Sequence, residues 1–174
     1  MAAGDVLWKE GTPIVWGNAI GGGIDEELDL GGADGDAGDV CVGSYRDFGA
    51  TPRAVDYRLD IFIDGFETAP VVGEQIDVYI SESSDGSVFT GPETPADTAD
   101  STGSTARLPN LLGPFPATVW STTAGNNIVV SYEFRTSARY LAPVVHNNTA
   151  DDLLATADAH TITITPLFPS VQQS

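Results

Sequence analysis

The stretch YRLDIFID, residues 57–64, alternates apolar and polar side chains along most of its length. The odd-numbered residues are apolar and would share one face of an extended strand: Tyr57, Leu59, Ile61 and Ile63. Polar side chains, joined by Phe62, take up the opposite face. This period of two predicts a β-strand with one face on a core and the other towards solvent.

Other segments repeat this period. Residues 76–81 alternate in the same way, and residues 161–165 form an unbroken alternation of β-branched side chains. In residues 127–135 the inward set is Ile128, Val130, Tyr132 and Phe134. A further strand is expected at 139–145. Weaker strand candidates are residues 6–9, 13–17, 40–46, 87–90 and 117–121.

The composition agrees with an all-β protein. The chain of 174 residues has 19 glycines and 11 prolines, which favour turns over long helices. A chain of this length is expected to form one compact domain. About eight to ten short strands predict a single two-sheet β-sandwich, jelly-roll-like in topology. We expect an extended N-terminal arm at residues 1–20 and the β-sandwich domain at residues 21–174.

Two tracts have neither a helical nor a strand pattern. Residues 21–39 are mostly glycine and acidic side chains, and residues 91–105 have no large apolar side chain. Both are predicted to be long acidic surface loops, solvated rather than packed. A short helical turn is allowed at residues 149–154, where Thr149 and Asp152 have the spacing of a capping pair.

The charge of the chain limits its partners. Seven basic and 25 acidic residues give a formal net charge of −18, which repels nucleic acid phosphates and anionic lipids. We therefore expect neither nucleic acid nor membrane partners. The first 20 residues lack the pattern of a secretory signal, and no apolar run is long enough to span a bilayer, so synthesis in a cytoplasm is expected. The single Cys41 is predicted to be a small buried hydrophobic residue.

No metal or cofactor motif is complete. Asp34, Asp36 and Asp39 lie among glycines, but the glutamate that closes an EF-hand loop is missing. A solvated loop and a weak cation site both remain open for this segment. His146 and His160 stand at strand ends without a third zinc ligand. No cofactor and no metal site are therefore predicted.

Catalytic patterns are also missing. The chain has no Gly-x-Ser-x-Gly elbow, and its many carboxylates make a close acidic pair uninformative. We therefore predict a protein that is not an enzyme. The chain has three tryptophans: Trp8, Trp16 and Trp120. Each could serve as a platform for a sugar ring, as a core residue or as an interface residue.

The N-terminal arm carries the candidate docking residues. Gly11, Pro13 and Gly17 interrupt its apolar pattern, which favours an extended arm over a regular strand pair. The predicted docking side chains are Leu7, Trp8, Ile14, Val15 and Trp16. The nearly neutral strands after residue 106 are expected to assist them, with the acidic loops facing solvent.

Three stretches together resemble a group of virion structural proteins of tailed bacteriophages. They are residues 78–86 followed by Phe89, residues 139–145 with Asn147, and residues 160–166. The likeness runs over about residues 55–168. It implies a small β-sandwich, made without a signal peptide, that attaches to a capsid as a decoration or cement subunit.

The resemblance and the residues lead to the same expectation. We expect a non-enzymatic virion protein that decorates or cements the outer surface of a tailed-phage capsid, with the major capsid protein or another virion protein as partner. It is expected to form homo-oligomers on the shell. The alternative is a carbohydrate- or receptor-binding β-sandwich module on a virion, which an exposed row of aromatic side chains would favour. A glycan hydrolase comes third.

Overall fold

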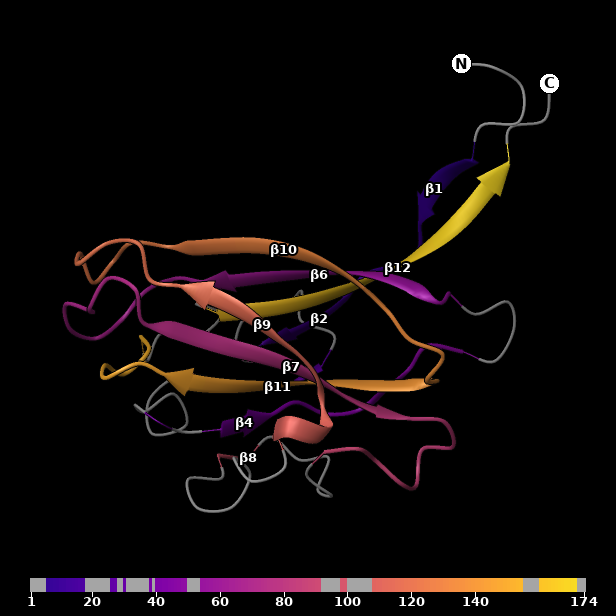
Figure 1. Cartoon of the computed structure of the whole chain (residues 1–174), viewed down its shortest axis with the longest axis horizontal. Coiled ribbons are helices and arrows are strands. Elements are labelled where there is room, and N and C mark those ends of the chain that lie inside the picture. Colours follow the sequence, from indigo (N-terminus) through magenta and orange to yellow (C-terminus); the bar gives the residue numbers. More distant parts are fainter. Residues whose placement is uncertain are drawn as a thin grey trace.

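The computed structural model describes residues 6–17, 26–27, 30, 38, 40–49, 54–91, 98–99, 108–154 and 160–171. Within these residues the chain forms twelve β-strands in two sheets and no α-helix. The sheets pack face to face as a sandwich (Figure 1). The predicted all-β sandwich is therefore confirmed.

The first sheet, sheet A, has the strand order β10-β6-β12-β2-β3, and β1 pairs with β12 off this path. All its pairs are antiparallel except the short parallel pair of β2 and β3. Its strands are β1 (Val6–Glu10), β2 (Ile14–Gly17), β3 (Glu26–Glu27), β6 (Asp56–Ile63), β10 (Ile128–Arg135) and β12 (His160–Val171).

The second sheet, sheet B, has the order β8-β4-β11-β7-β9, and β5 pairs with β11 off this path. All its pairs are antiparallel. Its strands are β4 (Val40–Val42), β5 (Arg46–Asp47), β7 (Gln75–Ser83), β8 (Thr98–Ala99), β9 (Leu112–Thr118) and β11 (Tyr140–Asn148).

Eight of these strands have the order of a jelly roll. Strands β2-β12-β6-β10 face strands β4-β11-β7-β9, so the chain crosses between the sheets after β2, β4, β6, β9, β10 and β11. This pattern of two four-stranded antiparallel sheets is the double Greek key of jelly-roll domains. The remaining short strands extend the two sheets at their margins.

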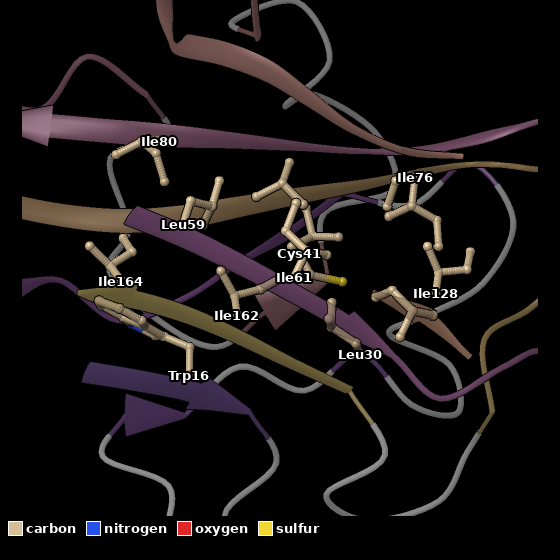
Figure 2. Packing of buried hydrophobic residues seen from close by; sticks show 14 of the residues in the cluster. Trp16, Leu30, Cys41, Leu59, Ile61, Ile76, Ile80, Ile128, Ile162 and Ile164 are labelled. Carbon is tan, nitrogen blue, oxygen red and sulfur yellow. The ribbon is translucent and has the colours of Figure 1, made fainter. Parts of the chain in front are cut away.

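Alternating side chains from both sheets form the main core (Figure 2). Strand β6 alternates between half-buried and buried residues without a break, as residues 57–64 predict. Its Leu59 and Ile61 meet Ile76 and Ile80 of β7 in this core. Cys41 is also buried there, which confirms its prediction as a small core residue.

Strand β9 differs from the prediction. It covers Leu112–Thr118, whereas the sequence indicated residues 117–121. The sequence does not predict this strand because it contains Pro114 and Pro116, and proline argues against a strand. They are tolerated because, among the described strands, β9 pairs with β7 alone and so leaves one edge without ladder hydrogen bonds.

Further segments correct the sequence-based expectations. The tracts 21–39 and 91–105, expected to be loops throughout, contain the short strands β3 and β8. Residues 87–90 form no strand; the Asp85 carboxylate accepts hydrogen bonds from the amides of Ser87 (2.9 Å) and Val88 (3.2 Å) and closes a turn instead. Residues 149–154 form no helical turn, and Leu153 pairs with Phe66 in an isolated β-bridge. Residues 40–46 divide into β4 and β5, which both pair with β11.

The hydroxyl of Thr165 gives the first prediction. This side chain is buried on β12, and its Oγ1 forms no hydrogen bond with the described residues. Thr165→Val keeps the shape and removes the unsatisfied polar group, so we expect the free energy of unfolding to rise by about 1 kcal/mol. Urea unfolding measures the change. The control is Thr163→Val on the same face, where the residue is only half-buried and little change is expected. A loss of stability in Thr165→Val would contradict the prediction.

Candidate docking site

A two-stranded ribbon leaves the body of the sandwich. Strand β12 pairs with β6 and β2 up to Leu167, and its residues beyond Leu167 pair with β1 alone among the strands that the structure describes. In the ribbon Trp8 lies opposite Pro169 and Glu10 lies opposite Leu167. Figure 1 shows β1 and the end of β12 projecting together away from the two sheets.

The base of the ribbon is held tightly to sheet A. The Glu10 carboxylate forms an ion pair with Arg58 of β6, and Arg58 also contacts Asp60 at 2.9 Å. The amide of Gly11 donates a hydrogen bond to the carbonyl of Pro166 (2.8 Å). A Cβ atom at Gly11 would lie 2.8 Å from the Phe168 ring, so only glycine fits this crossing without a shift of its neighbours. These contacts fix the position at which the ribbon leaves sheet A.

Among the ribbon side chains that the structure describes, Trp8 is the large exposed apolar one. It is 54% exposed and borders a hollow of about 210 Å³. Phe134 and Leu167 give this hollow apolar surface. Arg135 and Asp56 form a two-bonded ion pair at its margin (2.7 and 2.9 Å), and this contact holds the pKa of Asp56 below its ordinary value. An apolar group from another molecule could pack here against the indole.

The other predicted docking residues have different positions. Ile14 and Val15 are half-buried in β2, where they pair with Ile164 and Thr163 of β12. Leu7 pairs with Ser170 in the ribbon, and its side chain lies outside the described residues.

Trp16 is fully buried and not available to a partner. It stacks on Phe48 with ring centroids 6.4 Å apart, and its Nε1 donates to the carbonyl of Ser44 (2.8 Å). Strand β2 thus belongs to sheet A, and within residues 1–20 the described part that projects is β1.

The other side of the docking site, the end of β12, carries a weak signal in the sequence. Residues 166–170 were not assigned to a strand because Pro166 and Pro169 interrupt the alternation that ends at Thr165. The usable signal was the apolar pair of Leu167 and Phe168 between these prolines. It continues the strand pattern into the segment that pairs with β1.

The remaining candidate residues do not converge on one site. His160 is buried; its Nδ1 accepts a hydrogen bond from the amide of Asp64 (3.2 Å), and its Nε2 donates to the carbonyl of Leu154 (3.0 Å). His146 lies half-buried on β11 in the other sheet. Among the described residues, no group of three or more His, Cys, Asp or Glu side chains could hold a metal ion. Asp34, Asp36 and Asp39 lie outside the described residues.

The exposed tryptophans do not form a row. Trp120 is 62% exposed, and its Nε1 donates to the carbonyl of Asn127 (3.0 Å). It follows β9, whose end lies at the opposite end of the sandwich from the β1–β12 ribbon (Figure 1). The described tryptophans therefore offer two separate apolar contacts and no continuous platform for a sugar chain.

Comparison with known proteins leaves the docking site to be interpreted from its geometry. No protein-family model matches the chain, and no match is found among the curated proteins or the solved structures. The described part of the chain contains no helix that is long and apolar enough to cross a membrane.

The two tryptophans of the N-terminal segment give a matched prediction. Trp16→Ala removes a fully buried indole and should lower the free energy of unfolding by about 3–5 kcal/mol. Trp8→Ala removes an exposed indole and should change it by less than about 0.5 kcal/mol. Urea unfolding followed by circular dichroism measures both, with Trp16→Phe as the milder core variant. Equal losses for Trp8→Ala and Trp16→Ala would show that Trp8 belongs to the core.

Proposed function

We propose that the protein is a non-enzymatic structural component of a tailed-phage virion, which decorates or cements the outer surface of the capsid. It is made in the host cytoplasm and binds the major capsid protein or another virion protein. Support comes from the jelly-roll order of its eight principal strands, an architecture found in viral capsid and lectin domains. This support is an analogy of architecture, because one fold hosts many functions.

The single observation that carries the proposal is the projecting β1–β12 ribbon. The sandwich has its own core and does not need β1 to cover it, since β1 contacts the body mainly at its base. A two-stranded ribbon is marginally stable by itself in water. Packing against another molecule would stabilise it, and Trp8 with its neighbouring hollow supplies an apolar contact of the kind that dominates protein interfaces.

The charge supports a position on the outside of a shell. A net charge of −18 keeps the protein away from the packaged genome, because both are strongly anionic. It also keeps the copies of the chain soluble and separate before they assemble. Salt screens the attraction between exposed charges beyond about 8 Å at physiological ionic strength. Docking through an apolar side chain does not depend on that attraction.

A binding assay with undecorated capsids tests the proposal. The capsids come from the same phage and lack this protein, and the chain is added at low and at near-molar salt. We expect the full chain to bind under both conditions, and Trp8→Ala to bind about 30-fold more weakly, because a central tryptophan of an interface contributes about 2 kcal/mol or more. Deletion of residues 1–10 should abolish binding without removing β2 from sheet A.

The matched control is Trp120→Ala, which removes a similarly exposed tryptophan at the other end of the sandwich. It should bind as the full chain does. Equal binding of Trp8→Ala and the full chain would exclude the ribbon as the anchor. Release of the full chain by salt would point to the acidic loops as the contact surface instead.

A further inference from the structure

A second hollow, of about 420 Å³, opens on the outer face of sheet B. Strand β7 contributes Asp77 and Tyr79, and β11 contributes His146, which lies opposite Asp77 in the strand pairing. The segment 108–114 forms an apolar wall with leucine and proline side chains. Both strands turn their alternate side chains into the main core, so these polar groups point away from it.

Asp77 is nine-tenths buried in this hollow and has no partner there. The residue is 8% exposed, and its carboxylate forms no hydrogen bond or ion pair with any residue that the structure describes. An ionised carboxylate only accepts hydrogen bonds, and burying it without a donor or a positive charge is costly. A group that supplies both would offset this cost.

The neighbouring polar groups do not balance this charge. Burial lowers the pKa of His146 below its usual value, and the nearby Asp77 carboxylate opposes this effect only in part, so the imidazole is neutral at pH 7. Burial, with the same carboxylate, raises the pKa of the Tyr79 phenol, which stays neutral too. No lysine or arginine is among the described residues that line the hollow. Asp77 is thus the one acidic side chain among these lining residues, and no positively charged side chain among them faces it.

We propose that this hollow binds an organic cation, an ammonium or guanidinium group on a short apolar stem. Asp77 would pair with the charged group, and the neutral His146 and the side-chain amide oxygen of Asn148 would accept its further N–H donors. The Tyr79 ring would add a cation–π contact, and the wall formed by segment 108–114 would cover the stem. This site does not depend on the capsid proposal.

The arrangement favours an organic cation over two other ligand classes. A metal ion would require more ligands, and the described residues offer no group of three or more His, Cys, Asp or Glu side chains. A neutral sugar could donate hydrogen bonds to Asp77 but would leave its charge buried without a counter-charge. The apolar wall also suits a methylene stem better than a ring of hydroxyl groups.

The test is a titration followed by amide chemical shifts in NMR at pH 7 and low salt. Butylammonium represents a free amine, and the capped amino acids Nα-acetyl-lysine methylamide and Nα-acetyl-arginine methylamide represent side chains of a partner protein. We expect saturable shifts confined to β7, β11 and the segment 108–114. Tighter binding of the capped amino acids than of butylammonium would identify a protein side chain as the source of the cation.

Two matched controls separate this site from general attraction to an acidic protein. Asp77→Asn should weaken binding by about tenfold or more, whereas Glu133→Gln, with the same charge change at an exposed position on sheet A, should leave it unchanged. The lysine probe acetylated on its ε-amine has no charge and should not bind. Because the Asp77 carboxylate has no partner among the described residues, Asp77→Asn is expected to fold, which its own amide spectrum verifies.

Several results would overturn the proposal. These are equal binding of the charged and acetylated lysine probes to the unmodified chain, equal binding by Asp77→Asn and the unmodified chain, or shifts that never saturate. Shifts of the same amides by methyl α-glucoside or by calcium, without any response to the cations, would assign the hollow to another ligand class. The comparison of charged and acetylated probes decides the question even if a variant does not fold.

Discussion

Strand β12 forms hydrogen-bonded pairs with three other strands, and the arrangement of sheet A depends on these contacts. It joins β6 on one side and β2 on the other, and beyond them it pairs with β1. With twelve residues it is longer than β6 and β10, which have eight each. At about 3.3 Å per residue, the excess extends roughly 13 Å past its neighbours. The projecting ribbon is thus a consequence of strand length.

Sheet B follows a different pattern because its outer face is partly covered. Buried residues from β4 and β11 meet Leu108 and Leu111 in a second apolar cluster, separate from the main core. Strand β11 is consequently buried over much of both faces, whereas β10 alternates between inward and exposed residues. The same covering segment also encloses Asp77, an outward residue that an open sheet would leave in water. One local layer thus creates both the second cluster and the hollow beside it.

Most of the fold could be predicted from the sequence because long strands carry a strong period. The alternation in residues 57–64 and 128–135 correctly predicts which side chains of β6 and β10 face the core. Strand β9 could not be found in this way, since Pro114 and Pro116 are acceptable only on an edge strand, and edges are set by the whole sheet. The end of β12 is not predicted for a similar reason, because Pro166 and Pro169 interrupt its pattern.

The candidate sites were less predictable because they depend on contacts between distant residues. Trp8 and Trp16 lie in similar apolar stretches, yet one is exposed on the ribbon and the other is buried against Phe48. Asp77 and His146 come together only through the pairing of β7 with β11. A local pattern cannot encode such a pairing, although it can show which side of each strand faces outward.

The two proposed contacts lie on different sheets, and their chemistry differs accordingly. The ribbon continues sheet A and offers an exposed indole. The hydrophobic effect would drive its docking, so salt would have little influence on binding. The hollow on sheet B offers one buried carboxylate, which would select its ligand by charge. Because no described residue lines both hollows, a change in one should leave binding at the other intact. Two independent contacts would let one subunit join two neighbouring molecules, as the proposed cementing role requires.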